Sequence, residues 1–162
     1  MEIVKASAEQ IDEILKIYAS ARRFMRENGN MEQWNGNYPS RELLEEDVAQ
    51  KKLYLCVEEG EVLGVFYYAE ENDPTYAEIF DGAWLNDRPY GVMHRVAMAS
   101  RGRGAASFCM AYCYARCKNL KIDTHKDNIP MQKALERNGF VRCGIIHLAN
   151  GDPRIAYQRS ET

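Results

Sequence analysis

The sequence predicts a mixed α/β fold, built as one sheet with helices in a single domain over residues 1–162. The order of the expected elements is β α α β β β α β α β β, in which antiparallel strands precede two βα units and a final hairpin. A chain of 162 residues with 46% apolar residues is long enough for one domain with a sizeable core. Because strands and helices do not alternate regularly in this order, a doubly wound sheet is not expected.

The N-terminal part should form a strand, two helices and a pair of strands. Residues 1–6, MEIVKA, are typical of a short strand. The Ser-Ala-Glu-Gln segment at residues 7–10 is a capping box, and apolar residues follow it at helical spacing. A second helix is expected from Ser40. Residues 53–70, LYLCVEEGEVLGVFYYAE, are rich in β-branched and aromatic residues around a Glu-Gly turn, which indicates two strands.

The strand that precedes the most informative segment of the chain is YGVMHRVAMA, residues 90–99. Strict alternation of side chains along this strand would place Val92, His94, Val96 and Met98 on one face. His94 would then lie beside whatever binds along this face.

The remaining elements complete the βα units and the hairpin. A helix should end near Lys118, and LKIDTH at residues 120–125 is typical of a strand. A helix is expected over residues 128–138, with a proline in its first turn and a glycine after its end. Two strands within residues 140–159 should pair around an Asn-Gly turn.

The segment from Ala99 to Met110, ASRGRGAASFCM, begins a helix without any acidic residue. A helix N-terminus carries partial positive charge and usually attracts Asp or Glu, yet no carboxylate occurs from Ser100 to Lys118. The two glycines let the loop turn tightly, and the first N–H groups of the helix have no internal partner. With two arginines at its rim, the segment predicts a nest for a phosphate or pyrophosphate.

Other phosphate-binding loops match this segment less well. A P-loop ends in Gly-Lys-Ser/Thr, where this chain has Gly104-Ala105-Ala106. A dinucleotide-binding fingerprint requires a third small residue, here Ser107, and an acid about 20 residues later, for which Asp123 is near the right distance. A single RGRG segment in a chain of net charge −3 gives little support for RNA binding.

The segment Arg101–Ala106 resembles the Arg/Gln-x-x-Gly-x-Gly/Ala signature of the GNAT superfamily of acyl-CoA-dependent N-acyltransferases. The similarity extends back to the strand HRVAM and forward to DTHKDNIPMQKALERNGFVRCGII, residues 123–146. In this later part, Asn128 precedes a helix that ends at Gly139-Phe140, as in the family's second CoA segment. The loop and the Asn-helix-Gly-Phe pattern together make the resemblance specific.

The resemblance implies a largely antiparallel sheet that is splayed open beside HRVAM, where acetyl-CoA binds as a co-substrate and no metal is needed. It implies that the pantetheine arm runs along the backbone of Val96, Ala97 and Met98. The pyrophosphate would lie on the loop formed by Arg101, Gly102, Arg103, Gly104, Ala105 and Ala106. Asn128 is a further implied contact to the cofactor, and Lys126, Lys133 and Arg137 are candidates for its nucleotide end.

The reaction implied by the resemblance is direct transfer of an acetyl group from the thioester to a primary amine. The amine must lose a proton, and His94 is the leading candidate for the base, with Glu70, Glu71 or Asp81 as alternatives. His94 can equally be a structural, hydrogen-bonding histidine. Many relatives carry a tyrosine acid seven residues after the Asn, where this chain has Leu135, so the group that protonates the thiolate is left open.

Large aromatic residues gather in the two irregular segments of the chain, with acidic residues nearby. Trp34, Tyr38 and Trp84 are therefore the candidate acceptor-binding wall, because aromatic and acidic groups suit a cationic amine. A packed loop with a solvated acidic surface explains the same composition. Two other cysteines follow Cys109 at four-residue intervals on one helix face, where small core residues are a simpler interpretation than a metal site.

Composition limits the remaining partners and the compartment. With 21 basic and 24 acidic residues, the chain lacks the positive charge excess typical of nucleic-acid binding. No stretch approaches the roughly 20 apolar residues of a membrane span, and no signal peptide is visible. Five cysteines without an export signal predict reduced thiols and a cytoplasmic location. The expected partner is a small-molecule amine or a peptide amine, and a homodimer is left open.

Three functions are compatible with these residues. The first is an acetyl-CoA-dependent N-acetyltransferase of GNAT type. The second is a non-catalytic acyl-CoA-binding or sensing module on the same fold, which Leu135 favours. The third is a nucleotide- or RNA-binding protein that uses the same loop. Thioester turnover with amines distinguishes the first from the second, and a salt-sensitive RNA complex would favour the third.

Overall fold

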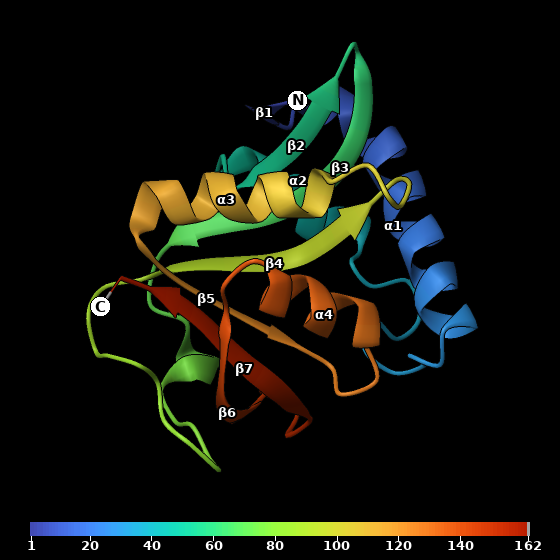
Figure 1. The fold of residues 1–162 in the computed structure, drawn as a ribbon. Coiled ribbons are helices and arrows are strands. Elements are labelled where there is room, and N and C mark those ends of the chain that lie inside the picture. Colours follow the sequence, from blue (N-terminus) through green and yellow to red (C-terminus); the bar gives the residue numbers. More distant parts are fainter. Residues whose placement is uncertain (162) are drawn as a thin grey trace.

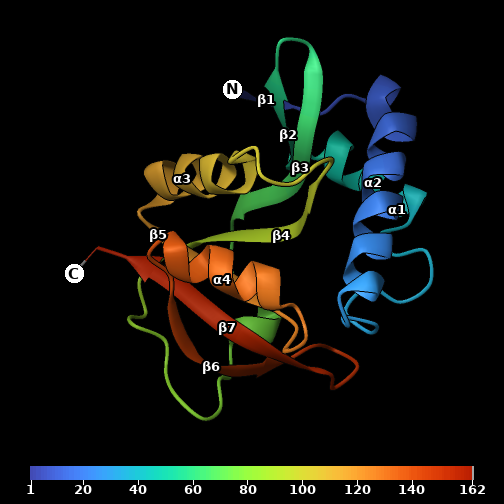
Figure 2. The same ribbon diagram turned by 45° about the vertical axis from the view of Figure 1, so that its right-hand side comes forward.

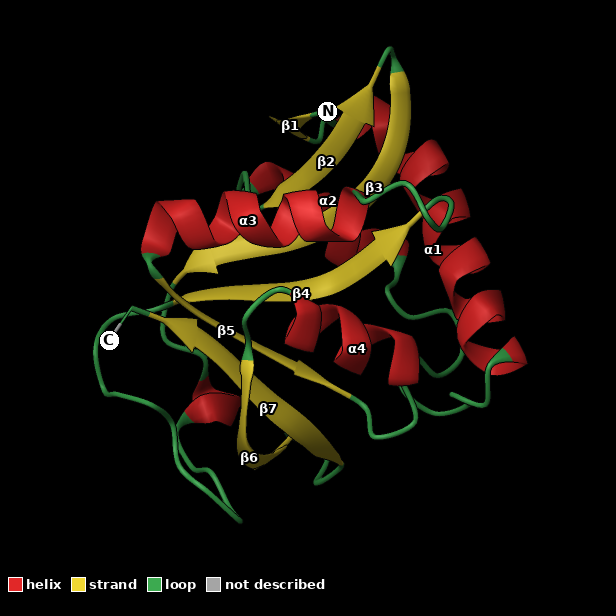
Figure 3. Ribbon diagram, in the orientation of Figure 1, coloured by secondary structure: helices red, strands yellow, loops and turns green. Residues whose placement is uncertain are grey.

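The computed structural model describes residues 1–161, which form a seven-stranded sheet flanked by four α-helices (Figures 1 and 3). The strand order is β1-β2-β3-β4-β5-β7-β6. The strands are β1 (Glu2–Lys5), β2 (Leu53–Glu58), β3 (Glu61–Glu70), β4 (Gly91–Met98), β5 (Asn119–Thr124), β6 (Val141–His147) and β7 (Pro153–Ser160). The helices are α1 (Ile11–Glu27), α2 (Arg41–Ala49), α3 (Ala105–Cys117) and α4 (Ile129–Arg137). Only β4 and β5 pair in parallel, so the predicted mixed and largely antiparallel sheet is confirmed for the described residues.

The helices cover the two faces of the sheet in pairs. Helices α1 and α2 pack on one face, and α3 and α4 pack on the other, as Figure 2 shows. The first face has a core that includes Ile14 and Leu44, and the second has a core that includes Leu135. Cys109 and Cys113 are buried in the second core, where burial raises the pKa of both thiols. They fit the expected role of small core residues.

Strands β4 and β5 are paired only where they begin. The aligned pairs between them are Gly91 with Leu120 and Val92 with Lys121. Beyond these pairs the strands diverge: β4 runs toward α1, whereas β5 passes beneath α4 (Figure 1). Among the described residues, this β4–β5 wedge leaves one edge of β4 without a neighbouring strand after Val92, as the resemblance to the GNAT superfamily implied.

A β-bulge lies in β4 at Arg95. In the β3–β4 pair, Tyr67 is opposite His94 and Val65 is opposite Ala97. One residue of β3 therefore faces two residues of β4 in this interval. Arg95 has a φ of +51°, in the left-handed region that residues other than glycine rarely adopt.

The bulge makes one prediction from the sequence wrong. Val96 and Met98 pack against the core beneath α3 and α4, whereas Val92 packs in the core beneath α1 and α2. Val92, His94, Val96 and Met98 therefore do not share a face, because the extra residue shifts the alternation of every residue after it. The Tyr18 hydroxyl of α1 donates a 2.6 Å hydrogen bond to the carbonyl oxygen at the bulge, which fastens this backbone to the helix.

Local capping signals set the helix boundaries as predicted. The capping box of Ser7 and Gln10 is formed, and the Ser40 hydroxyl accepts a hydrogen bond from the backbone N–H of Leu43. The Asn128 side chain in turn accepts a hydrogen bond from the backbone in the first turn of α4. These short-range contacts set the residues at which the helices begin.

Candidate active site

A cavity of about 360 Å³, which we call the loop cavity, lies where β4 ends and α3 begins. Ten predicted cofactor-binding residues line it: Val96, Ala97, Met98, Arg101, Gly102, Arg103, Gly104, Ala105, Ala106 and Asn128. On α4, the lining side chains are those of Pro130, Met131, Ala134 and Arg137. Lys126 and Lys133 are exposed and are not among the residues that line this cavity, whereas Arg137 lines it.

The backbone of the loop is open toward the cavity. Gly102 and Gly104 have φ values of +78° and +76°, and a Cβ added to either would meet no atom within 4 Å. Gly104 is the N-cap of α3, and the first turn of this helix contains no acidic residue. The N–H groups of that turn have no carbonyl partner within the helix. The segment therefore fits an anion such as a pyrophosphate.

The two arginines of the loop differ in their surroundings. The Arg101 guanidinium lies 4.0 Å from the ring centre of Phe24 on α1, in a cation–π contact. Arg103 is partly exposed and forms ion pairs with Glu58 at 3.2 Å and Glu61 at 3.8 Å. The charge of Arg103 is therefore shared with two carboxylates, and Arg101 is the less compensated cation at the rim.

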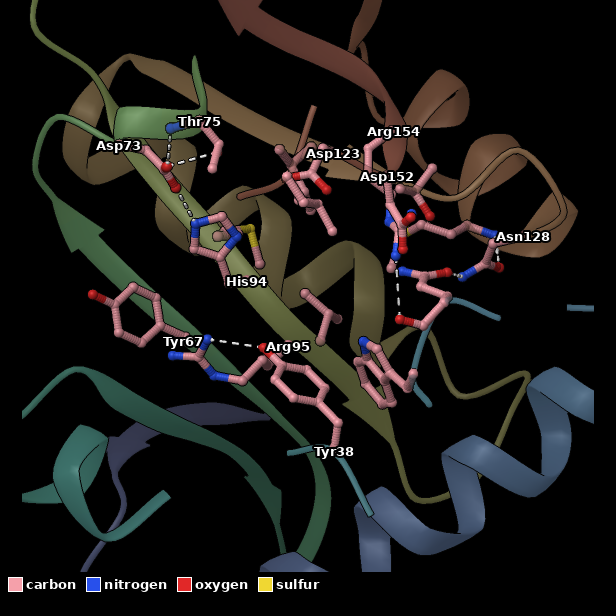
Figure 4. Close-up of a pocket in the computed structure, with 18 of the residues that line it drawn as sticks. Tyr38, Tyr67, Asp73, Thr75, His94, Arg95, Asp123, Asn128, Asp152 and Arg154 are labelled. Carbon is pink, nitrogen blue, oxygen red and sulfur yellow. Dashed lines mark hydrogen bonds and ion pairs between the residues drawn. The ribbon is translucent and has the colours of Figure 1, made fainter. Parts of the chain in front are cut away.

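A second cavity of about 630 Å³, which we call the His94 cavity, opens on the other side of the wedge (Figure 4). It is lined by the loop between α1 and α2, by β3, β4 and β5, by residues 71–75 and by the β6–β7 hairpin. Met25, Val96, Asn128 and Met131 line both cavities. The loop cavity and the His94 cavity therefore adjoin at the β4–β5 wedge.

His94 is held by an aspartate that the sequence analysis did not select. Its Nε2 lies 2.8 Å from Oδ2 of Asp73, and Asp73 also accepts hydrogen bonds from the backbone N–H and the hydroxyl of Thr75. Burial would raise the pKa of Asp73, but the hydrogen bonds and the neighbouring imidazole outweigh it and hold this pKa at about 2. With Nε2 engaged, Nδ1 of His94 is the ring nitrogen turned toward the cavity (Figure 4).

A buried arginine forms another wall of the His94 cavity. Nε and Nη2 of Arg95 donate hydrogen bonds of 3.0 and 2.8 Å to Oδ2 of Asp47 on α2, and its guanidinium lies 4.5 Å from the ring centre of Tyr67. Burial raises the pKa of Asp47 in spite of this pairing. The Tyr67 hydroxyl donates a 2.7 Å hydrogen bond to Glu71, and burial together with this bond raises the pKa of Tyr67. The charge of Arg95 is thus compensated inside the wall.

Two of the three aromatic residues predicted to bind the acceptor reach the His94 cavity. Trp34 and Tyr38 line it, with their ring centres 6.3 Å apart. Trp84 does not line it: its Nε1 donates a 2.9 Å hydrogen bond to the carbonyl of Tyr76, and its ring packs against the Tyr76 ring. The packed-loop interpretation therefore describes Trp84, because this side chain fills the space under its own loop.

Asp81 and Leu135 also lie outside the His94 cavity. Asp81 is exposed, next to a short bridge between Phe80 and Ile145 of β6, and it is not among the lining residues. This position does not suit the predicted alternative base. Leu135 is fully buried in the core beneath α3 and α4, so the position where relatives carry a tyrosine acid faces packed side chains.

The signals for Asp73 and Arg95 in the sequence are weak. Asp73 precedes a proline, which indicates a turn but no partner for a histidine. Arg95 lies between strand residues, where alternation gives no hint of a bulge. Their partners, His94 and Asp47, are 21 and 48 residues away along the chain.

Comparisons with known proteins give the family of this chain and structures of similar fold. Residues 11–140 match the family model described as Acetyltransferase (GNAT) family, and the chain belongs to that family. A search of curated proteins finds no significant match. Among solved structures, a GNAT-family acetyltransferase from Streptococcus agalactiae 2603 is 27% identical with a TM-score of 0.90, and the match covers 99% of this chain and 95% of that one.

More distant structures share the fold. A GNAT-family acetyltransferase from Bacillus cereus ATCC 10987 is 20% identical with a TM-score of 0.67, over 99% of this chain and 97% of that one. A ribosomal-protein-alanine N-acetyltransferase from Brucella melitensis is 17% identical with a TM-score of 0.67, over 99% of this chain and 100% of that one. At these identities the likeness shows the fold alone.

Within residues 1–161, no helix is both long and apolar enough to cross a membrane. The same residues contain no group of three or more His, Cys, Asp or Glu side chains placed to hold a metal ion.

Proposed function

We propose that this protein transfers an acetyl group from acetyl-CoA directly to a primary amine. The observation that carries the proposal is the meeting of two cavities at the β4–β5 wedge. The loop cavity offers an anion-binding loop, and the His94 cavity offers a titratable side chain beside the same stretch of β4. Two reactants that enter from opposite sides would meet at Val96, which lines both cavities.

The loop cavity would hold the cofactor. The backbone N–H groups after Gly104 and the side chain of Arg101 would bind the pyrophosphate, and Arg137 would bind toward the nucleotide end. The free edge of β4 would pair with the pantetheine arm, because this edge has no strand neighbour after Val92. Acetyl-CoA, when bound, supplies an activated thioester. A backbone N–H near Val96 would polarise the thioester carbonyl.

The His94 cavity would bind and deprotonate the amine. A free primary amine has a pKa of about 10, so most of it arrives protonated at neutral pH. His94 would accept the proton through Nδ1, directly or through one water, while Asp73 holds the ring in place and stabilises the imidazolium. The Trp34 and Tyr38 rings would contact the body of the acceptor.

The leaving thiolate receives no side-chain acid from the position of Leu135. We therefore propose that water in the loop cavity protonates the thiolate. This same feature favours the second candidate function, an acyl-CoA-binding module on the same fold that does not turn the thioester over.

One experiment separates these two functions. Purified protein is given acetyl-CoA and a panel of amines, amino acids, polyamines and peptides, and the release of free CoA thiol is followed. We expect acceptor-dependent release with at least one class of amine. Tight binding of acetyl-CoA by calorimetry without release for any acceptor would support the binding module, and an absence of acetyl-CoA binding would overturn both functions.

A further inference from the structure

Arg154 is a buried cation that lines the His94 cavity and whose charge no described carboxylate neutralises. It lies near the start of β7, and its residue is only 6% exposed. Figure 4 shows its side chain on the side of the cavity away from His94 and Asp73, beside Asp152 and Asn128. It therefore lies within the acceptor side of the proposed active site.

The described contacts of Arg154 are with neutral groups. Nη1 donates a 2.9 Å hydrogen bond to the carbonyl of Pro153, and Nη2 donates a 3.3 Å hydrogen bond to the carbonyl of Gln33. No carboxylate oxygen of residues 1–161 lies within the 4.0 Å of an ion pair. These two bonds leave other guanidinium N–H donors without a described acceptor.

Arg95 shows what a compensated arginine looks like in the same cavity. Nε and Nη2 of Arg95 donate to the Asp47 carboxylate, so its charge is neutralised by a residue of α2. A buried charge without a partner is costly, and natural proteins usually keep one only with a counter-ion or a ligand. The difference between Arg154 and Arg95 points to a negative group that comes from outside the chain.

The acidic residue nearest in sequence does not supply this group. Asp152 lines the same cavity, but its carboxylate accepts a 3.2 Å hydrogen bond from the side chain of Asn150 and forms no ion pair with Arg154. The pKa of the nearby His125 is lowered by burial and by the positive charge of Arg154. Arg154 therefore adds a positive charge to this part of the cavity, and no ion pair within the described residues neutralises it.

We propose that Arg154 binds a carboxylate of the acceptor, so that the acceptor is an amino acid or another amine that carries a carboxylate. This inference rests on the proposed function, because it places the amine of the same molecule at the wedge beside His94. A guanidinium binds a carboxylate with two parallel hydrogen bonds, which gives orientation as well as affinity. The carboxylate would thus fix the amine in one direction toward the thioester.

The test compares pairs of acceptors that differ only in this charge. The probes are the common L-amino acids, β-alanine and γ-aminobutyrate, each beside its carboxamide, and kcat/KM is measured by release of CoA thiol. For at least one pair we expect the acid to be preferred about 10- to 100-fold, the range for a hydrogen bond to a charged group. Arg154→Gln should reduce this preference to about onefold, and Arg154→Lys should restore part of it.

A matched control and a binding measurement separate the possible failures. Arg142→Gln removes an exposed arginine of β6 outside both cavities and should leave the preference unchanged. If acids and amides react equally well in the wild type, or if Arg154→Gln keeps the preference, the inference is wrong and the proposed function stands. If nothing reacts, binding of the N-acetyl amino acids is measured by calorimetry. Binding that is lost in Arg154→Gln supports the carboxylate site without the reaction, and no binding overturns it.

Discussion

The loop cavity and the His94 cavity are built in different ways. The loop cavity depends on one continuous segment, Arg101–Ala106, whose backbone N–H groups and glycine conformations make the anion site. The His94 cavity depends on side chains from segments that are far apart in the sequence, held by pairs such as His94–Asp73 and Arg95–Asp47. Backbone recognition needs only a local conformation, whereas side-chain recognition needs the whole sheet to be assembled. Substitutions in the two cavities should therefore have separable effects.

The largest loss of ligand affinity is expected in the loop cavity. Gly104→Glu places a carboxylate where we expect the pyrophosphate, and we expect acetyl-CoA affinity to fall by more than about 100-fold because like charges repel at short range. Gly104→Ala is the matched control: it carries the same strain at φ +76° into open space but adds no charge. Calorimetry on both folded variants measures the affinity for acetyl-CoA. Equal affinities would mean that this loop does not bind the pyrophosphate.

A large loss of rate is expected in the His94 cavity. His94→Gln keeps a polar side chain but removes the base, so kcat/KM should fall by about 10²- to 10⁴-fold while acetyl-CoA affinity is unchanged. The dependence of kcat/KM on pH should also change, because the group that accepts the amine proton is gone. The exposed His147 of β6 gives the matched control, His147→Gln. A pH–rate profile of His94→Gln that coincides with that of the wild type would make His94 structural.

The two aromatic loops should separate binding from stability. Trp84→Ala should lower the free energy of unfolding by about 3 kcal/mol, the low end for loss of this side chain since it is partly exposed, and leave the acceptor KM unchanged. Tyr38→Ala, in the lining of the His94 cavity, should raise the acceptor KM with little loss of stability because Tyr38 is exposed. Urea unfolding and steady-state kinetics on both variants test this contrast. A higher acceptor KM without loss of stability in Trp84→Ala would mean that Trp84 binds the acceptor.

The smallest effect follows from the pKa of Asp73, which is about 2 in the folded protein against 3.8 for the free side chain. A lowered aspartate pKa stabilises the fold at pH values above 3.8, and this contribution is lost as the pH falls through 2. Asp73→Asn should therefore cost about 2 kcal/mol at pH 7, and the difference from wild type should shrink toward zero near pH 2. Chemical denaturation at several pH values measures it. A difference that does not depend on pH would mean that the Asp73 carboxylate is not stabilised in its charged form.

The sequence by itself determined the local features of this protein. The capping box at Ser7, the turn residues and the helix that begins without an acid at Gly104 depend on contacts over a few residues, so the element order and the loop cavity could be predicted. The sequence also shows Leu135 where relatives carry a tyrosine, and the structure shows that this side chain is buried in the core. These features need no knowledge of how distant segments pack.

The tertiary structure decided the chemistry of the acceptor side. The bulge at Arg95, the His94–Asp73 pair and the burial of Arg154 without a counter-ion each depend on segments that are far apart in the sequence. Trp84 and Asp81 have the residue types expected of a binding wall, but in the folded chain neither lines the His94 cavity. The alternation and composition of residues describe one segment at a time. Whether a buried charge forms an ion pair depends on which strand or loop lies beside it in the assembled sheet.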